Sequence, residues 1–380
     1  MNHELLPVAV RTALSTVTRS VLIDADRLTE IRERYASEQT ESLGRYLAAS
    51  QSPNTLRAYR SDWCAWLGWC QQEGRQALPA DPLDVAVYLA AAADAVRDDG
   101  RPAFSPATLD RKAAAIAAVH AANGLPSPTR SDVVRLTMRG VRRTRRAQPQ
   151  RKRPVLLHTL SELLEQVPAG IAGVRDRMLL LIGFAGALRR SELAGLSVDD
   201  VEVHTDPGTG EPVLILRLGV TKTDQVAVYG QQVALPRGAK PQTCPVCAVA
   251  DWLRVLETGS LPQRDPGLHG CHGFTGTPLA DGHGRPLVPA VDRYGRIGTK
   301  AMSDRSVANI VKKYAQQAGL DPALFAGHSL RAGFATQAAL GGAGDREIMR
   351  QGRWSNAAMV HRYIRTAKPL EDNAVTKLGL

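Results

Sequence analysis

The pattern of apolar and polar residues predicts an all-helical region in the first part of the chain. Amphipathic helices are expected from the capping segment 52–55 through Trp69 and then at 83–96, 109–122 and 132–146, separated by turns that contain Pro or Gly. Trp63, Trp66 and Trp69 fall on one face of the first helix. We interpret this face as core rather than as a platform for stacking bases, because large aromatic rings at helical spacing are usually buried.

After Pro154 the pattern changes, and helices alternate with short strands. Strands separated by turns rich in Gly, Pro and Asp predict a small antiparallel sheet at 198–203, 213–220 and 225–235. The Gly-, Pro- and His-rich stretch 258–300 is expected to be a long surface loop. Helices are predicted at 160–167, 173–187, 246–256, 304–318 and 328–340, with a shorter one from 347 and a last one at 356–364.

These boundaries predict four parts. A flexible N-terminal arm (1–35) precedes a helical domain (36–148), a basic interdomain linker (149–155) and a second domain (156–380) that ends in an amphipathic tail (366–380). The longest apolar stretch, 177–188, is interrupted by Gly and followed by two arginines, so no membrane span is expected. Asp24 and Asp26 interrupt the N-terminal apolar stretch, which does not resemble a secretory signal. The five cysteines, an odd set, fit a reducing cytoplasm.

The positive charge of the chain is concentrated in one segment. Residues 130–153 contain ten Lys or Arg and one Asp, a net charge of +9, and the rest of the chain carries only +2 of the total of +11. Such a stripe is typical of a surface that binds a phosphate backbone. The alternative is a solvated linker, because blocks of like charge are often disordered.

A set of residue types suited to phosphoryl transfer lies in the last sixty residues. His328 and Arg331 share one face of a helix and could hold a phosphate, Tyr363 offers a phenol oxygen as a nucleophile, and Trp354 offers an indole N–H donor. Taken singly, each residue could instead be structural. Upstream, Glu192 lies three residues after Arg189, where its carboxylate could hold the guanidinium, and Lys222 lies in a turn between two predicted strands.

Four segments carry a resemblance to the tyrosine recombinase (phage integrase) family. They are Gly186-Ala-Leu-Arg-Arg-Ser-Glu-Leu193, Thr221-Lys-Thr223, Gly327-His-Ser-Leu-Arg-Ala-Gly333 and Gly352-Arg-Trp-Ser-Asn356 with Arg362-Tyr-Ile-Arg365. The Trp at 354, where most members carry a second His, resembles the Cre-like branch. The resemblance spans roughly 50–380 and is weakest in 258–300.

The resemblance implies a fold and a reaction. The expected fold is mainly α with a small antiparallel β-sheet. An all-helical core-binding (SAM-like) domain and an α+β catalytic domain would form a C-shaped clamp on DNA. The reaction would cleave and rejoin DNA through a 3′-phosphotyrosyl intermediate and a Holliday junction, without metal, ATP or another cofactor. In that reaction Tyr363 attacks the scissile phosphate, and His328 accepts its proton. Arg189 and Arg331 clamp the phosphate, and Trp354 donates a hydrogen bond to it. Lys222 is the general acid for the 5′-oxygen that leaves, and Glu192 supports Arg189.

DNA contacts are expected from both domains. Arg305 is the candidate for a bidentate guanine contact, with a plain phosphate contact as the alternative. The other expected DNA-binding residues lie on the helices of the first domain and along the basic stripe: Arg57, Arg60, Arg111, Lys112, Arg139, Arg142, Arg143, Arg145, Arg146, Arg151 and Lys152. No metal is expected. A zinc site made by Cys244, Cys247, Cys271 and either His269 or His272 is kept as the lesser alternative.

By resemblance, the partner is double-stranded DNA with an inverted-repeat recombination site. The protein would be a monomer in solution, a dimer on each site and a homotetramer in the synaptic complex, where the tail 366–380 docks into a neighbouring protomer or, alternatively, packs on its own domain. It would be a cytoplasmic, nucleoid-associated protein encoded by a bacterium or phage. Two other functions remain open from the sequence, a type IB-like topoisomerase and a catalytically silent DNA-binding protein.

Overall fold

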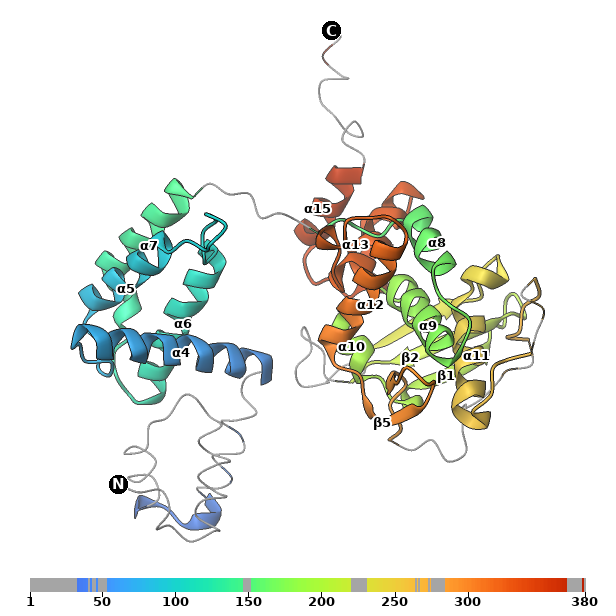
Figure 1. Cartoon of the computed structure of the whole chain (residues 1–380), viewed down its shortest axis with the longest axis horizontal. Helices are drawn as coiled ribbons and strands as arrows, with labels where there is room; N and C mark the ends of the chain where they lie inside the picture. The colour runs from blue at the N-terminus through green and yellow to red at the C-terminus, as the bar shows by residue number, and fades with distance from the viewer. Residues whose placement is uncertain are drawn as a thin grey trace. The chain divides into compact units, whose positions relative to one another are not determined.

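The chain divides into two units. The computed structural model describes residues 33–39, 42, 46, 53–145, 152–219, 231–263, 265, 267–272, 274, 284–367 and 378. Unit 1 comprises residues 1–149 and unit 2 residues 150–380. The described part of unit 1 is helical, and unit 2 combines helices with two small antiparallel sheets, so the predicted fold class is confirmed (Figure 1).

Unit 1 contains the four predicted helices: α4 (Pro53–Glu73), α5 (Pro82–Asp94), α6 (Pro106–Ala122) and α7 (Asp132–Thr144). Side-chain caps fix where two of them begin. The Asp81 carboxylate accepts from the Leu83 N–H at 2.6 Å, and Ser105 Oγ accepts from the Thr108 N–H at 3.2 Å. A proline follows each cap, at a position where its missing N–H leaves no helical bond unmade.

The tryptophans of α4 form the core of unit 1. Trp66 is fully buried, and its ring stacks on Trp69 with 5.4 Å between centroids and meets Tyr88 edge-on. Its indole N–H donates to the Ala77 carbonyl at 3.1 Å. Trp63 and Trp69 are partly buried against the same cluster. The interpretation of this face as core is therefore confirmed, because Trp66 is fully buried and the other two rings pack against the same cluster.

The predicted DNA contact of Lys112 is wrong, because this side chain belongs to the core. Only 5 % of it is exposed, and its ammonium donates to the Tyr88 hydroxyl at 3.2 Å and lies 3.7 Å from Asp62. The ammonium also lies 4.7 Å from the centroid of the Phe104 ring, a cation–π distance. Arg111, the residue before it, is exposed and pairs with the same Asp62 at 2.7 Å.

The larger sheet of unit 2 has the strand order β1 (Val201–Thr205), β2 (Pro212–Arg217) and β3 (Gln232–Pro236), all antiparallel. Buried residues alternate along each strand, as expected for a sheet that covers a core on one face. Helix α11 (Pro245–Thr258) contacts β2 and β3 and also packs on α9 (Ile171–Ala185). The core of unit 2 thus lies between this sheet and a pair of apolar helices.

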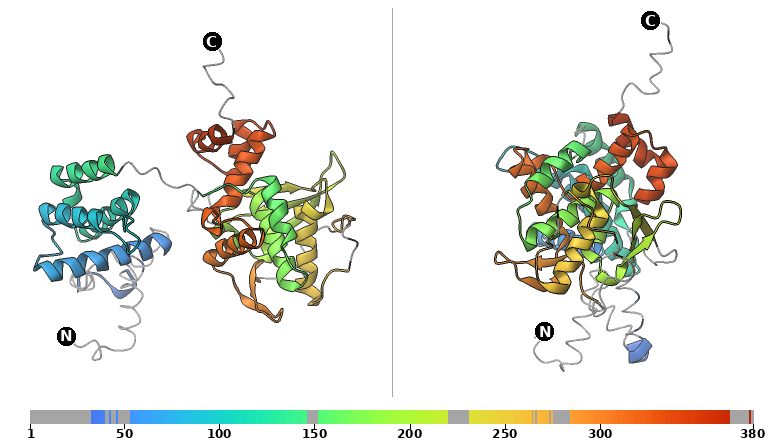
Figure 2. Two further views of the ribbon diagram at one scale, coloured as in Figure 1. Left: turned by 45° about the horizontal axis from the view of Figure 1, so that its top comes forward. Right: turned by 90° about the vertical axis from the view of Figure 1, so that its right-hand side faces the viewer.

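The prediction that 258–300 is a surface loop is wrong in two places. A hairpin forms from β4 (Pro289–Val291) and β5 (Ile297–Ala301), and Cys271, Leu287 and Val288 are fully buried. The hairpin has little signature in the sequence, because β4 has only three residues and β5 is mostly exposed and carries a Gly and a Lys. Figures 1 and 2 show this hairpin at the end of unit 2 opposite α15.

The remaining α-helices of unit 2 are α8 (Leu157–Glu165), α10 (Arg190–Gly195), α12 (Asp304–Gln317), α13 (His328–Leu340), α14 (Asp345–Gly352) and α15 (Ala357–Ala367). The candidate site lies on or beside α10, α13, α14 and α15. The backbone of residues 152–155 runs close to the start of α13 and to the turn that precedes it. The Arg153 N–H donates to the Leu324 carbonyl at 2.7 Å, and the Val155 N–H donates to the Ser329 carbonyl at 3.0 Å. A Cβ at Gly333 would lie 1.8 Å from the Val155 carbonyl oxygen, so this approach requires glycine.

Some predictions fall outside the described residues. These are most of the N-terminal arm, the first residues of the interdomain linker (149–151), the turn between the second and third predicted strands with the adjoining strand ends (220–230), and the tail from 368, apart from Leu378. Within the described part of the chain, no helix is both long enough and apolar enough to cross a membrane.

Candidate active site

The structure brings His328 and Tyr363 together. His328 is the first residue of α13, and Tyr363 lies in the middle of α15. The His328 Nε2 lies 2.9 Å from the Tyr363 hydroxyl oxygen, a hydrogen-bond distance. His328 is exposed and Tyr363 is half-buried. A phenol that contacts an imidazole at an accessible position has a base in place to take its proton.

Arg331 lies one helical turn after His328 and is almost completely buried. Only 1 % of it is exposed, and its guanidinium carbon lies 4.1 Å from the centroid of the Trp354 ring. Its Nη1 donates to the Ala187 carbonyl, while its Nη2 has no hydrogen-bond partner among the described residues. Burial, with Arg189 and Arg353 nearby, lowers the pKa of Arg331 to about 9. The guanidinium thus remains charged at neutral pH.

Glu192 supplies the negative charge in a cluster of arginines that includes Arg189 and Arg331. Its Oε2 accepts from the backbone N–H of Arg189 at 2.8 Å, and its Oε1 accepts from the guanidinium of the same residue. The carboxylate thereby caps α10 and holds the Arg189 side chain, as predicted from their spacing of three residues. Burial alone raises the pKa of Glu192, but Arg353 and Arg189 outweigh it, so the pKa lies below its ordinary value.

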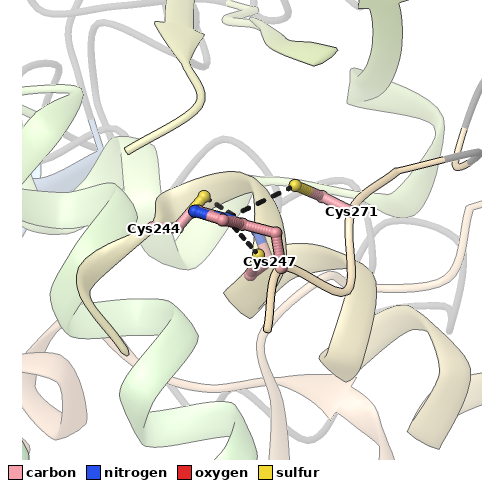
Figure 3. A group of neighbouring side chains, drawn as sticks. Cys244, Cys247 and Cys271 are labelled. Carbon is pink, nitrogen blue, oxygen red and sulfur yellow. Dashed lines mark hydrogen bonds between the residues drawn. The ribbon is translucent and has the colours of Figure 1, made fainter. Parts of the chain in front are cut away.

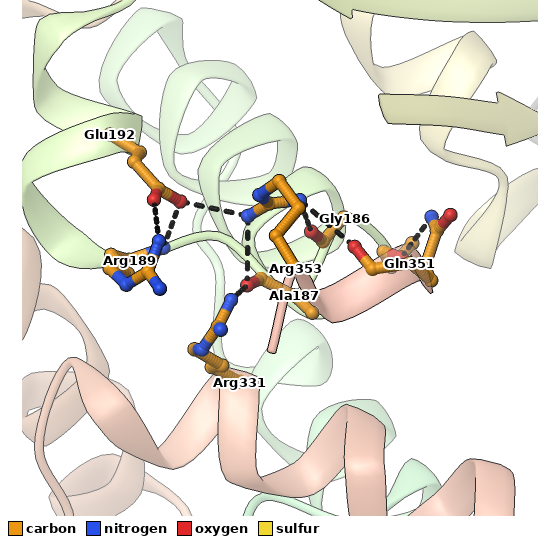
Figure 4. A network of polar contacts seen from close by, with 8 residues as sticks. Gly186, Ala187, Arg189, Glu192, Arg331, Gln351 and Arg353 are labelled. Carbon is orange, nitrogen blue, oxygen red and sulfur yellow. Dashed lines mark hydrogen bonds and ion pairs between the residues drawn. The ribbon is translucent and has the colours of Figure 1, made fainter. Parts of the chain in front are cut away.

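Sequence reasoning missed Arg353, which the structure places in the same cluster (Figure 4). The Arg353 Nη2 lies 2.8 Å from Glu192 Oε2 and 3.3 Å from the Ala187 carbonyl oxygen. Its Nη1 lies 3.2 Å from the Gly186 carbonyl oxygen. Arg353 and Ala187 both have a positive φ, of 55° and 46°. These rare backbone conformations carry strain, and here they accompany the contacts that pair Arg189 and Arg353 with the Glu192 carboxylate and bring Arg331 and Arg353 to the Ala187 carbonyl. The adjacent Trp354 was the only signal in the sequence.

Comparisons with known proteins identify the family. A sequence model of the phage integrase family matches residues 294–369, which contain His328, Arg331, Trp354 and Tyr363. Over 340 residues the chain is 34 % identical to an integrase/recombinase XerD homologue of Selenomonas ruminantium, with 88 % of each protein covered. The chain belongs to the phage integrase family of tyrosine recombinases. The family and the activity predicted from the sequence, site-specific recombination, are therefore confirmed.

Two further comparisons agree with this placement. The recombinase Cre of Escherichia phage P1 is 25 % identical over 325 residues, which cover 83 % of this chain and 84 % of Cre. Among solved structures, the XerH site-specific recombinase in a post-cleavage complex with a palindromic difH substrate gives a TM-score of 0.54 at 14 % identity, covering 96 % of this chain and 93 % of XerH. This last similarity concerns the fold.

The predicted DNA-binding residues of this recombinase differ in what their side chains contact. Arg142 pairs with Asp110 at 2.5 Å, Arg145 donates to the Phe104 carbonyl at 2.8 Å, and Lys152 donates to the Ala323 carbonyl. Arg57 donates to Asn54 at 2.9 Å and stays exposed. Arg60, Arg139, Arg143 and Arg305 are also exposed. Three residues of the predicted set lie outside the described part of the chain: Lys222, Arg146 and Arg151. Their roles remain predictions from the sequence.

Replacing Glu192 with glutamine is expected to destabilise unit 2. The change leaves Arg189 and Arg353 without their counter-charge in a buried position, which costs about 3 kcal/mol and lowers the Tm by roughly 5–10 °C. Calorimetry at pH 7 measures the shift, and Glu162→Gln on the exposed face of α8 is the matched control, expected to change the stability by less than about 0.5 kcal/mol.

The pH dependence provides a second readout of the Glu192→Gln experiment. Because the folded pKa of Glu192 is lowered, its contribution is fully present above the unfolded pKa of about 4.3 and is lost as the pH falls through the folded value. The difference in Tm between wild type and Glu192→Gln should therefore shrink below about pH 4.5. An equal loss in both glutamine variants at pH 7 would show that Glu192 does not hold the cluster together.

Proposed function

We propose that this recombinase cleaves DNA by attack of the Tyr363 oxygen on a scissile phosphate. The attack forms a 3′-phosphotyrosyl bond and breaks the bond to the 5′-oxygen, which leaves as a hydroxyl. Attack by a 5′-hydroxyl from a second duplex reverses the step and gives a Holliday junction. The observation that carries the proposal is the 2.9 Å contact between His328 Nε2 and the Tyr363 hydroxyl, beside Arg331 and Trp354.

Each neighbouring side chain has a role in this step. A free phenol has a pKa of about 10, so Tyr363 needs a base, and His328 is in position to accept its proton. Arg189 and Arg331 bind the non-bridging oxygens and neutralise the charge that grows on them in the transition state. Trp354 adds a neutral N–H donor. Lys222 protonates the leaving 5′-oxygen, a role that rests on the Thr221-Lys222-Thr223 segment and the family.

Arg331 has an N–H donor for a phosphate oxygen, but the donor is buried in the protein without DNA. Its Nη2 is a buried donor without a partner in the described structure, and such a donor costs free energy that a phosphate oxygen would recover. Because Arg331 is only 1 % exposed, a phosphate reaches that nitrogen only after Trp354 and its neighbours move. We infer that DNA binding drives this opening, which would keep Tyr363 inactive in the free protein.

The chemistry requires neither ATP nor a metal. The phosphotyrosyl bond replaces one phosphodiester by another, so the bond energy is conserved and rejoining needs no outside source. The positive charges that a metal would supply come from the guanidinium groups of Arg189 and Arg331, which can bind phosphate oxygens through two N–H donors. Glu192 and Arg353 set the position of Arg189 through the contacts described above.

Both units are proposed to contact one half-site of an inverted-repeat DNA site. Exposed arginines of α4 and α7 supply phosphate contacts from unit 1, among them Arg139 and Arg143, for which the described structure shows no acidic partner. Two protomers would occupy each site and four would form the synaptic complex, with the tail 366–380 docked into a neighbour. The protein would act on the nucleoid in the cytoplasm.

Replacing Arg305 with alanine is expected to change which DNA sequence is preferred. Arg305 is exposed in the first turn of α12, where its planar fork can reach a guanine edge. Selection from randomised half-sites should show lost discrimination at one or two positions, worth about 1–3 kcal/mol. Lys313→Ala, at an exposed position on the same helix, is the control and should leave the consensus unchanged. Equal weakening on every sequence would make Arg305 a phosphate contact.

Covalent capture tests the proposed function as a whole. Wild-type protein is incubated with fragmented DNA of the native replicon, the mixture is denatured, and the DNA that stays attached to protein is sequenced. Adducts that converge on an inverted repeat support the recombinase. Scattered adducts would favour a topoisomerase-like activity, and a footprint without adducts would favour a silent DNA-binding protein.

A further inference from the structure

Four potential metal ligands meet in unit 2, in a region that the proposed recombination chemistry does not use. Cys244 immediately precedes α11, Cys247 lies in its first turn, and His269 and Cys271 come from the segment 267–272. One ligand atom from each residue can be chosen so that all four lie within 4.8 Å of one another. Figure 3 shows the three sulfur atoms directed toward a common point.

The spacing of these atoms fits a tetrahedral ion. Zinc binds thiolate sulfur at about 2.3 Å and imidazole nitrogen at about 2.0 Å, so neighbouring ligand atoms in a tetrahedron lie roughly 3.5–3.8 Å apart. The His269 Nδ1 lies 3.3 Å from the Cys247 sulfur and 4.0 Å from the Cys271 sulfur. Small shifts of these side chains would bring both contacts to the expected value. Three cysteines and one histidine are also a ligand set that structural zinc sites use.

The surroundings of Cys244 suit a thiolate. Its sulfur accepts hydrogen bonds from the backbone N–H groups of Gly238 at 3.3 Å and of Cys247 at 3.4 Å. A Cβ at Gly238 would lie 2.9 Å from the Cys244 Cα, so glycine permits the loop to approach the sulfur this closely. The N-terminal end of α11 adds a favourable field for negative charge. Backbone donors and a helix start thus stabilise the deprotonated form that a metal requires.

The second part of the site is held in place independently of any ion. Arg254, on α11, donates to the Gly270 carbonyl at 2.9 Å and lies 5.8 Å from the centroid of the Phe274 ring. The loop therefore lies against the same helix that carries Cys247. Cys271 is fully buried, and His269 is half-buried. An ion among these ligands would be largely shielded from water, which is typical of a structural site.

We propose that Cys244, Cys247, His269 and Cys271 bind one zinc ion with four protein ligands. With all four positions filled by side chains, the ion has no open position for a substrate, so its role is structural. It joins the segment 267–272 to the start of α11, which packs on β2, β3 and α9. The site is separate from the proposed catalytic set, and its presence does not depend on the proposed function.

Geometry selects His269 over His272 as the fourth ligand. His272 is exposed, and its ring centroid lies 6.2 Å from that of His269. The two histidines thus form a matched pair on the same loop. His269→Ala removes a ligand and His272→Ala removes a neighbour, while Cys271→Ser and Cys64→Ser form a second pair, because Cys64 is exposed on α4 in unit 1.

Zinc analysis of purified full-length protein tests the proposal. Wild type, His272→Ala and Cys64→Ser should each contain about one zinc ion per chain, whereas His269→Ala and Cys271→Ser should contain less than about a tenth of that after dialysis against a weak chelator. Zinc below about 0.1 per chain in wild type, even after incubation with equimolar zinc, would overturn the proposal. Equal zinc loss in His269→Ala and His272→Ala would overturn the assignment of the ligands.

Three measurements on wild type keep the test valid if a variant fails to fold. Cobalt(II) in place of zinc should give the intense visible bands of a tetrahedral site and the near-ultraviolet absorption of cobalt–thiolate bonds. Zinc release should accompany the modification of about three thiols by an organomercurial, and strong chelation should lower the Tm by on the order of 5 °C. A disulfide between any two of the three cysteines, or a cobalt spectrum typical of six oxygen ligands, would overturn the proposal.

Discussion

Replacing Tyr363 with phenylalanine is expected to abolish DNA cleavage and to leave DNA binding unchanged. The variant lacks only the phenol oxygen that contacts His328 at 2.9 Å, and no other hydroxyl is proposed to take its place. Its partly buried ring, which lies 5.9 Å from that of Trp354, remains. Cleavage of a nicked substrate that traps the covalent product should fall by at least about 10⁴-fold, as expected when a nucleophile is removed.

The matched control is Tyr294→Phe. Tyr294 is 67 % exposed near the β4–β5 hairpin and is not part of the proposed catalytic set. This variant also loses only a phenol oxygen, but from a residue outside the proposed catalytic set. Its cleavage rate should therefore stay within about twofold of the wild-type rate. Gel-shift affinities should agree for all three proteins. Residual covalent product in Tyr363→Phe above about 1 % of the wild-type rate would mean that another residue attacks the phosphate.

Replacing Arg331 with lysine is expected to slow cleavage by about 10²–10³-fold although the positive charge remains. Lysine lacks the planar fork that binds two phosphate oxygens, and its ammonium cannot stack on Trp354 as the guanidinium does at 4.1 Å. It also loses the contact between Nη1 and the Ala187 carbonyl. Arg346→Lys, at an exposed position on α14, is the control and should cleave at the wild-type rate.

A substrate with a partly neutralised phosphate distinguishes charge neutralisation by Arg331 from a purely structural role. A substrate with a methyl group in place of one charged oxygen of the scissile phosphate develops less negative charge in the transition state. The deficit of an Arg331→Ala variant should therefore be at least about tenfold smaller on this substrate than on the natural phosphate. If the ratio of the two rates is unchanged from wild type, Arg331 only supports the fold, and its role as a phosphate clamp is wrong.

The candidate site could be predicted from the sequence because its residues lie in short segments with local geometry. His328 and Arg331 are three residues apart at the start of one helix, and Arg189 and Glu192 form a cap at the start of another, so local spacing alone places each pair. The helices of unit 1 could be placed because prolines and capping residues mark where they begin.

Tertiary contacts decided what the sequence could not. Arg111 and Lys112 are neighbours in the chain, but Asp62 and Tyr88, distant in sequence, draw Lys112 into the core and leave Arg111 at the surface. Arg353 joins the arginine cluster through a left-handed backbone conformation that no spacing rule indicates for arginine. In 258–300, glycines and prolines suggested a loop, whereas a short hairpin and a buried cysteine were set by packing against the rest of unit 2.

The chemical identity of the covalent adduct is the most direct test of the proposed mechanism. Protein captured on its DNA site is digested with protease and nuclease, and the peptide that carries a nucleotide is sequenced by mass spectrometry. The proposed mechanism predicts a single peptide with a phosphate bridging the Tyr363 oxygen and a 3′-carbon, together with a free 5′-hydroxyl on the other strand end. A 5′-phosphate linkage, or a nucleotide attached to any other residue, would contradict it.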